Sequence, residues 1–592
     1  MVTQAKHNSI VVDSRTSFQR TQETLRELRS SGLGIDAQLH LALKELFAGR
    51  MSYVSAGIPE RIEVAKCCLD RVIEVAGQWV DTAGLLKGIP KGHPARSEDV
   101  LTGPVVTARQ LRLIIQGLSD IEKIGVPKLP RPVEQNAAGK LTTTVAPVKE
   151  LFDHLVFLGF RGDVHFESET VADQIQLRED GSSSTDNPVK VTLILGAGNV
   201  TSIPLTDTLK AVFQDESLVL LKIHPLTKCL KPVFEHVLEP LIQAGWVRII
   251  DCDLDVTQQA IRDTRVDLIH VTGSAETYNS IVWGPAGKER DKRLASNTPL
   301  ISKPVTSELG CVSPWIMMPG SYSNRQLKFQ AENVASSVCN NASFNCVATD
   351  VLITWKGWSK REQFLDLIDE TFDAVPPRPA YYPGAIDRYE QFVGELPACA
   401  EKNLLPWTMI RGVDANSESR FFEQESFCCA FVEVAIDAKD EAEFLEKSVE
   451  FCNERLWGNL CAAVTVPNAT KRKGKKRKLL DEQLDKLNYG SIGVNHWPGL
   501  IYAQISPPWG GAPGNSPGDI SSGSGWGHNS YRLQSAQKTV LEGPLTVFPK
   551  PIWFPTHANP EPIAWKLLDL YHKPSPLNFL KLGVQSAKNL FA

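Results

Sequence analysis

Residues 190–222 read KVTLILGAGNVTSIPLTDTLKAVFQDESLVLLK. Two short apolar runs in this stretch, Lys190–Leu195 and Ser217–Lys222, have the length and composition of buried strands. Between them, Pro204 opens a segment that runs to Phe213 with a helical pattern. A strand, a short helix and a second strand with short connections predict a parallel βαβ unit.

The same alternation continues toward the C-terminus. Apolar residues between Leu226 and Ile242 recur at steps of three and four and predict an amphipathic helix. Further strands are expected at Trp246–Ile250 and Asp267–Val271, with helices at Val256–Thr264 and from Ala275 onward. Such repeated alternation is typical of an α/β fold with a doubly wound parallel sheet, covered by helices on both faces.

Polar residues follow three of these expected strands. Asn199, Lys222 and the run Thr272-Gly273-Ser274 each stand where a strand ends. Ligands of open α/β sheets bind at the carboxyl ends of the strands. We therefore expect these residues to share one ligand-binding edge.

Composition narrows the class of protein. The chain has 592 residues, of which 42% are hydrophobic and 22% charged, and a formal net charge of −5. These values exclude a disordered, collagen-like or coiled-coil chain and give no sign of a nucleic-acid partner. No apolar run approaches the roughly 18 residues of a transmembrane helix, so we expect no transmembrane segment. We see no secretory signal at the N-terminus.

Cysteine usage indicates a reducing environment and no metal centre. The chain has 12 Cys residues, with no CxxC pair and no Cys/His cluster at zinc spacing. We expect a cytoplasmic protein without a metal site. In such a chain, one Cys in a special context is a candidate nucleophile.

Two segments after the expected parallel sheet carry reactive side chains. Glu308 lies between an apolar strand and a glycine turn, and Cys346 lies past a helix in a loop of small polar residues. A thiolate is a strong nucleophile near neutral pH, and a nearby carboxylate can act as a base on water or on the thiol. Cys311 and Cys339 are rivals, but their apolar contexts favour packing roles.

Taken in order, the segments resemble the NAD(P)-dependent aldehyde dehydrogenase superfamily. SELGCVSPWI at 307–316 is similar to its glutamate motif, and NASFNCVA at 341–348 to its cysteine motif. The supporting segments are GAGN before Pro204, LLKIHP at 220–225, VTGSAET at 271–277, QESF at 424–427, LCAAV at 460–464, GSIGVN at 490–495 and PPWGG at 507–511. The similarity runs from about residue 191 to about residue 540, more than half of the chain.

The resemblance implies a function and a set of catalytic residues. Cys346 would attack an aldehyde, and the resulting hemithioacetal would lose hydride to NAD or NADP and become a thioester. Glu308 would activate the water that releases a carboxylic acid. The amide of Asn199 and the backbone N–H of Cys346 would hold the developing oxyanion.

The resemblance also implies how the cofactor is held and how the chain is organised. Lys222 would bind the adenosine ribose, Gly273 and Ser274 would lie against the cofactor, and Glu425 and Phe427 would hold and flank the nicotinamide ribose. We expect an N-terminal helical segment at 1–125, a dinucleotide-binding domain at 126–308, a catalytic domain at 309–495, and a loop and C-terminal tail at 496–592. A small-molecule aldehyde substrate and a homo-oligomer are also implied.

The chain departs from the family pattern at several positions. Ser343-Phe344 replaces the Gly-Gln before the nucleophile, Cys311 replaces the second Gly of the glutamate motif, and Gly198 replaces the Trp before the catalytic Asn. Tyr278 takes the place of a family glycine, where its side chain would crowd a bound pyrophosphate. Pro225 lies near the position whose residue would determine the preference for NAD or NADP. Two alternatives stay open: an acyl-thioester reductase or CoA-acylating relative, and a non-catalytic descendant.

Two further segments have no counterpart in the resemblance. The basic run Lys471–Lys478 is interpreted as a solvated loop insertion, with a nuclear signal or polyanion contact as the alternative. In the tail, Ile563–Tyr571 and Phe579–Ala592 are expected to form amphipathic helices. We expect these helices to dock on the body or on a partner subunit, with membrane-surface contact as the alternative.

Overall fold

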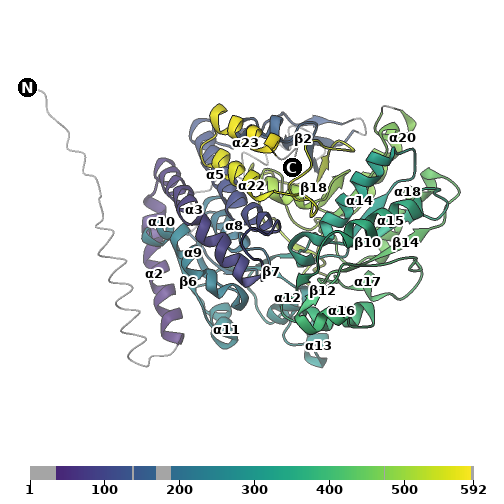
Figure 1. The fold of residues 1–592 in the computed structure, drawn as a ribbon. Coiled ribbons are helices and arrows are strands. Elements are labelled where there is room, and N and C mark those ends of the chain that lie inside the picture. The colour runs from purple at the N-terminus through teal and green to yellow at the C-terminus, as the bar shows by residue number, and fades with distance from the viewer. Residues whose placement is uncertain (1–34, 137–138, 168–188, 473, 589–592) are drawn as a thin grey trace, which may run out of the picture.

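The computed structural model describes residues 35–136, 139–167, 189–472 and 474–588 (Figure 1). Residues 1–34 of the expected N-terminal segment and the last residues of the expected tail helix, 589–592, lie outside this part of the chain. Within it, no helix is both long and apolar enough to cross a membrane. Two β-sheets organise the molecule, one of six strands and one of ten.

The six-stranded sheet is the parallel sheet that the sequence predicts. Its strand order is β17-β8-β7-β4-β5-β6, and all neighbours are parallel except β17, which runs antiparallel to β8. At the shared edge, Leu195 pairs with Lys222 and with Val271. The strands are β4 (Val191–Leu195), β5 (Leu218–Lys222), β6 (Val247–Ile250), β7 (Leu268–Gly273), β8 (Val305–Leu309) and β17 (Gly523–Ser524).

Helices from two parts of the chain pack on this sheet. Helix α8 (Ile203–Phe213) begins with Pro204 in its first turn and packs on β4 and β5. The helix α2 (Ile35–Ser55) packs on β5 and β6, and α12 (Ala275–Val282) on β7 and β8. The remaining helices around this sheet are α3 (Ile58–Leu86), α4 (Arg96–Val100), η1 (Leu101–Val105), α5 (Val106–Ile124), α11 (Leu254–Arg262) and α13 (Lys288–Ser296).

One expected helix is broken. The segment 226–242 was expected to be a single amphipathic helix, but it forms η3 (Pro225–Leu230), α9 (Lys231–Val237) and α10 (Glu239–Gln243). Pro232 and Pro240 lie in the first turns of α9 and α10. Proline has no backbone N–H and clashes with the preceding turn, so each one starts a new helix.

The ten-stranded sheet builds the second lobe. In Figure 1 its strands β10 and β14 lie on the right, and β2 and β18 lie near the top. Its order is β1-β2-β3-β18-β16-β15-β9-β10-β14-β13. The chain forms β1, β2 and β3 of this sheet before the parallel sheet, and it returns to the ten-stranded sheet at Gly310, between β8 of the first sheet and β9 of the second. The strands are β1 (Glu134–Gln135), β2 (Leu141–Ala146), β3 (Arg161–Phe166), β9 (Ser313–Met317), β10 (Thr349–Trp355), β13 (Thr408–Ile410), β14 (Ala430–Ile436), β15 (Cys461–Thr465), β16 (Ser491–Val494) and β18 (Ala536–Glu542).

Helices also cover the second sheet. They are α14 (Asn324–Cys339), α15 (Arg361–Asp373), α16 (Ala385–Val393), α17 (Arg420–Glu423) and α18 (Glu441–Arg455). Helix α14 begins with a capping box, in which Ser323 and Gln326 each satisfy a backbone N–H of the other. Helix α14 packs on α15 and β10, and α18 on β9 and β14. Cys311 and Cys339 are buried in the core of this lobe, as their contexts predict.

The region 126–146 is not the exposed connection that its Pro, Thr and Ala content suggests. Strand β2 is almost entirely buried, because it lies between β1 and β3 in the ten-stranded sheet. Leu141 and Val145 pack with Val164 and Phe166 of β3 and with Leu533. Strand β18 then pairs with β16, which joins this hairpin to the sheet of the same chain.

Most of the described part of the basic run is helical, where a loop was expected. Residues 475–478 form the first turn of α20 (Lys475–Lys486), and Lys471 ends the short helix α19 (Asn468–Lys471). Arg477 and Lys471 pair with the two oxygens of Glu542 at 2.8 and 3.0 Å. The run is therefore tied to β18 on the body of the protein. Lys and Arg have a high helix propensity, and the ion pairs with Glu542 hold the helices in place.

The tail forms two helices that dock on the body. These are α22 (Glu561–His572) and α23 (Pro576–Lys588), drawn in yellow in Figure 1. Helix α22 packs on α4 and α5. Arg109 of α5 donates to the Tyr571 hydroxyl at 2.7 Å, and Phe579 of α23 stacks on Phe152 with ring centroids 5.6 Å apart. The prediction that the tail docks on the body is confirmed.

Candidate active site

The structure brings the two reactive side chains together where the lobes meet. Glu308 lies near the end of β8 in the first sheet, and Cys346 follows η4 (Asn340–Ser343) in the second lobe. The thiol of Cys346 donates toward Oε1 of Glu308, with Sγ and Oε1 3.9 Å apart. Both residues line one cavity of about 760 Å³. A thiol and a carboxyl group are thus placed side by side in a space that can hold a small molecule.

The loop before Cys346 has an unusual backbone. Asn341, Ala342 and Ser343 have φ of 52°, 54° and 66°, all in the left-handed region. Such conformations cost on the order of 1–3 kcal/mol each for residues with a side chain, and they persist only where the surroundings impose them. The Asn341 N–H donates to Oε2 of Glu98 at 3.0 Å, and the Ala342 carbonyl accepts from the Cys429 thiol at 3.4 Å. These contacts set the direction in which Cys346 leaves the loop.

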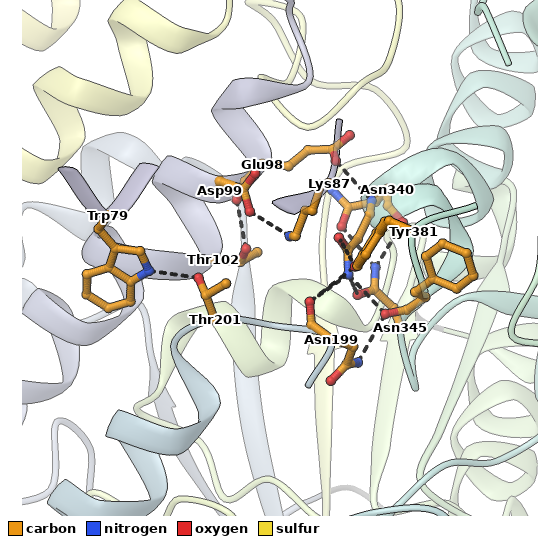
Figure 2. A network of polar contacts seen from close by, with 12 residues as sticks. Trp79, Lys87, Glu98, Asp99, Thr102, Asn199, Thr201, Asn340, Asn345 and Tyr381 are labelled. Carbon is orange, nitrogen blue, oxygen red and sulfur yellow. Dashed lines mark hydrogen bonds and ion pairs between the residues drawn. The ribbon is translucent and has the colours of Figure 1, made fainter. Parts of the chain in front are cut away.

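Asn199 lies directly against this cysteine loop. Its side-chain Nδ2 donates to the Phe344 carbonyl at 3.0 Å, and its backbone oxygen accepts from Nδ2 of Asn341 at 3.1 Å (Figure 2). The Tyr381 hydroxyl donates to Oδ1 of Asn341 at 2.9 Å. A side-chain amide nitrogen carries two N–H groups, of which the Phe344 carbonyl accepts one. Asn199 itself does not line the cavity that holds Cys346 and Glu308, although the next residue, Val200, does. Asn199 is therefore near the nucleophile, but its direct partner is the loop backbone.

Residues of the N-terminal helices lie next to the cysteine loop and to Asn199, and no pattern in the sequence indicated this. Lys87 and Asp99 form an ion pair of 2.6 Å, with both side chains at most 2% exposed. The indole of Trp79 donates to the Thr201 hydroxyl at 2.9 Å, close after Asn199 in the chain (Figure 2). The only available signal was a few charged and aromatic residues in segments that read as ordinary amphipathic helices.

Glu308 has an environment suited to a base near neutral pH. Its side chain is buried, and burial raises the pKa of its carboxyl to about 7, against the lowering effect of hydrogen bonds from Trp509 and Cys346. The Trp509 indole N–H donates to Oε1 at 2.7 Å. On the other side, a Cβ at Gly527 would lie 2.4 Å from Oε2. Trp509 lies in the quoted PPWGG segment, but nothing in that segment indicated this contact.

The thiol of Cys346 is protonated in this setting. Burial raises its pKa well above the ordinary value, and the nearby charges of Glu308 and Glu425 add to the effect. An isolated thiolate is therefore disfavoured. Deprotonation of Cys346 instead requires a nearby proton acceptor, and Glu308 is within reach.

The expected cofactor residues lie along the edge between the sheets. Lys222 ends β5, where burial lowers the pKa of its ammonium. Gly273 ends β7, and a Cβ added there would meet no atom within 4 Å. Ser274 caps α12 by accepting the Thr277 N–H at 3.1 Å. Lys222 and Gly273 are the last residues of β5 and β7, which flank β4 in one parallel sheet, and Ser274 directly follows β7.

Glu425 and Phe427 come from the other lobe, beside the crossing at Gly310. Oε1 of Glu425 is buried and has no hydrogen-bond partner among the described residues. A Cβ at Gly310 would lie 2.1 Å from Oε2 of Glu425, so only glycine allows this close approach. Phe427 packs near Phe344 and has a φ of 44°.

Two features of these residues are compatible with a bound dinucleotide. The unpartnered Glu425 oxygen can accept a hydroxyl such as that of a ribose, and the space beside Gly273 is open. Tyr278, which was expected to crowd a pyrophosphate, is 2% exposed and packs among Val282, Trp283 and Leu309. Across the described residues, no group of three or more His, Cys, Asp or Glu side chains is arranged to bind a metal ion.

Comparisons with known proteins identify the fold. No protein-family model matches the sequence, and no curated protein matches it. Solved structures do match: an indole-3-acetaldehyde dehydrogenase complexed with NAD+ (TM-score 0.59, 15% identity, 86% of this chain and 89% of that chain) and the aldehyde dehydrogenase KauB from Pseudomonas aeruginosa (0.58, 16%, 86% and 88%). A glyceraldehyde-3-phosphate dehydrogenase from Methanocaldococcus jannaschii complexed with NADP also matches (0.56, 13%, 86% and 95%). The α/β architecture expected from the sequence is thus confirmed as the fold of these dehydrogenases.

Proposed function

We propose that this chain, which has the aldehyde dehydrogenase fold, oxidises an aldehyde to a carboxylic acid with NAD or NADP. The observation that carries the proposal is the 3.9 Å approach of the Cys346 thiol to the Glu308 carboxyl inside one cavity. The two groups come from different sheets, and their order along the chain matches the motifs of the resembling family. At the low identity of the matched structures, the fold alone does not specify a reaction.

In the proposed first step, Glu308 removes the proton of the Cys346 thiol. The sulfur lone pair then forms a C–S bond to the aldehyde carbon, and the carbonyl π electrons move to oxygen. Asn199 Nδ2 and the Cys346 backbone N–H would donate to this oxyanion. One such donor is typically worth about 2.7–4 kcal/mol of barrier.

Residues of both lobes would hold the cofactor. Lys222, Gly273 and Ser274 would bind its adenosine and pyrophosphate part, while Glu425 would accept from a nicotinamide ribose hydroxyl and Phe427 would pack beside it. The chemistry that the cofactor supplies when bound is the acceptance of hydride from the hemithioacetal carbon. The substrate is left as a thioester on Cys346.

Before the last step, Glu308 releases the thiol proton to solvent. It then removes a proton from water as the water oxygen attacks the thioester carbon, and the C–S bond breaks to release the acid while Glu308 returns the proton to the Cys346 sulfur. A base with a pKa near 7 is well matched to this role at neutral pH. This argues against the acyl-thioester reductase alternative, in which an efficient water base would destroy the intermediate. The homo-oligomeric state and the cytoplasmic location stay predictions.

The proposal is tested with the full-length protein and two oxidised cofactors. Aliphatic and aromatic aldehydes are incubated with NAD or NADP, the formation of reduced cofactor is followed, and the acid is identified. We expect acid formation that is lost in Cys346→Ala. Turnover that survives Cys346→Ala, or activity found only with acyl-CoA and reduced cofactor, would contradict the proposal. Absence of both turnover and cofactor binding would favour the non-catalytic alternative.

A further inference from the structure

The cavity that reaches Cys346 and Glu308 continues to the protein surface. At its inner end Glu308 is 4% exposed, whereas the lining residues Leu155, Leu158 and Phe548 are 57%, 75% and 70% exposed. The cavity therefore runs from a buried reaction centre to an apolar mouth. Its volume, about 760 Å³, is far larger than an aldehyde group requires.

The lining of this cavity offers almost no charge to a substrate. Of the described residues that line it, the charged ones are Glu308 at the inner end and Lys550. The Lys550 ammonium is paired with Oε1 of Glu332 at 2.6 Å. A phosphate, carboxylate or ammonium on the substrate would lose water here without gaining a free partner, which is costly.

Several polar groups in the lining are also occupied by the protein itself, whereas the Tyr502 hydroxyl and the Trp553 indole N–H are buried there without a hydrogen-bond partner among the described residues. The Tyr571 hydroxyl accepts from Arg109 at 2.7 Å, the Trp497 indole donates to the Val347 carbonyl at 2.6 Å, and the Ser586 hydroxyl donates to the Leu582 carbonyl at 2.9 Å. What remains facing the cavity is predominantly hydrocarbon, so its recognition of a ligand is hydrophobic and weakly directional.

The tail helix α23 forms one side of the mouth. Phe579, Leu582 and Gly583 line the cavity, and the stacking of Phe579 on Phe152 holds the helix in place. A Cβ added at Gly583 would meet no protein atom within 4 Å, and Gly583 is exposed. The cavity therefore reaches the protein surface at this helix.

We propose that this cavity binds the hydrocarbon chain of a medium- or long-chain aliphatic aldehyde, with the carbonyl at Cys346 and the chain directed past α23 to the surface. The proposal rests on the proposed function for its chemistry, but the cavity argues for the chain independently. Burying one methylene group contributes about 0.8 kcal/mol, which corresponds to a roughly fourfold gain in affinity or kcat/KM.

The test uses the full-length protein, a series of unbranched aldehydes from propanal to dodecanal, and 1-decanol, which cannot react with the thiol. We expect kcat/KM to rise about fourfold for each added methylene before it levels off. Gly583→Phe, which places a ring in the mouth, should lower the ratio of kcat/KM for decanal to that for propanal about tenfold, the effect of losing roughly two buried methylenes. Val584→Phe is the matched control, since Val584 is on the same helix but does not line the cavity.

Calorimetric binding of 1-decanol separates this inference from the proposed function. Binding of decanol to the wild type that is weakened by Gly583→Phe and by Leu158→Glu, at an exposed lining position, supports the inference, even if no aldehyde is oxidised and the proposed function fails. Aldehyde oxidation with kcat/KM independent of chain length and of Gly583→Phe would overturn the inference while the proposed function stands. Failure of decanol to bind the wild type would also overturn it.

Discussion

The indole N–H of Trp509 donates to Oε1 of Glu308 at 2.7 Å, and the same oxygen faces the Cys346 thiol at 3.9 Å. One carboxyl oxygen is thus shared by a fixed donor and by the proposed nucleophile. A donor to a carboxylate favours the ionised form, so Trp509 opposes the effect of burial on the pKa of Glu308. Trp509 is therefore a positioning residue for the proposed base.

Trp509→Phe should move the pH dependence of turnover upward. The ring is kept but the N–H is lost, and a hydrogen bond to a charged group contributes about 1.5–3 kcal/mol. The pKa of Glu308 should rise from about 7 by about one to two units. The measurement is kcat against pH, and Trp497→Phe is the control, because its indole N–H donates to the Val347 carbonyl instead. If the midpoint of the pH dependence of kcat is unchanged in Trp509→Phe, Trp509 does not affect the pKa of Glu308.

Gly527→Ala should impair the base by steric displacement. The new Cβ would lie 2.4 Å from Oε2 of Glu308, so the carboxyl must shift. A misplacement of this size typically costs about 10- to 100-fold in rate, and we expect kcat to fall by this amount. Gly518→Ala is the control, since a Cβ at that position meets no atom within 4 Å. Equal kcat in the two variants would show that the site tolerates the shift.

Glu308→Gln should stabilise the folded protein at alkaline pH. The pKa of Glu308 is raised from 4.5 to about 7 in the fold, so the folded state binds the proton more tightly and wild-type stability falls as pH rises through this window. Glu308→Gln has no ionisable group at this position, so its stability does not fall in this way. Its free energy of unfolding at pH 8 should exceed that of the wild type by up to about 3 kcal/mol. The gain should vanish near pH 4.5.

Chemical denaturation at the two pH values measures this difference. The exposed Glu446→Gln is the control and should show no comparable gain. A loss of stability in Glu308→Gln at pH 8 would mean that the ionised carboxyl is better solvated than its burial indicates.

Arg109→Met should destabilise the protein strongly. Arg109 binds both oxygens of Asp153 at 2.8 and 2.5 Å, with both side chains 1% exposed, and also donates to the Gln504 carbonyl and the Tyr571 hydroxyl. Removing one partner leaves Asp153 buried without its counter-ion, which costs about 3–5 kcal/mol. Arg248→Met breaks a partly exposed pair with Glu45 and should cost roughly 1 kcal/mol or less. Similar midpoints in urea unfolding of the two variants would contradict this account.

The sequence predicted those parts of the structure that short-range patterns govern. The strands around Val191–Leu195 and Leu218–Lys222 were found because buried parallel strands are short apolar runs between turn signals. Glu308 and Cys346 were found because each lies in a segment similar to a family motif. The assignments of Asn199 and of the cofactor residues stay predictions about roles, although the structure places Lys222, Gly273 and Ser274 at strand ends of one parallel sheet.

Long-range contacts account for what was missed. Trp509 and Gly527 act on Glu308 from more than 200 positions away along the chain, and no local pattern reports such a contact. Strand β2 looked like a connection because its Thr-rich run is buried only by pairing with distant strands. Pro232 and Pro240 are a local signal for helix breaks, but the apolar periodicity of residues 226–242 favours one continuous helix.

The central claim is that Cys346 forms a thioester that Glu308 hydrolyses. The direct measurement is intact-mass and peptide mass spectrometry of Glu308→Gln after mixing with decanal and NAD or NADP. Loss of Glu308 should slow thioester hydrolysis more than thioester formation, because the thiol can still lose its proton to solvent whereas water without a base is a poor nucleophile. We therefore predict a slowed release of one equivalent of reduced cofactor and an acyl adduct on the peptide that carries Cys346, with no adduct in the Cys346→Ala background. Rapid acid release without an adduct, or an adduct on another residue, would contradict the account.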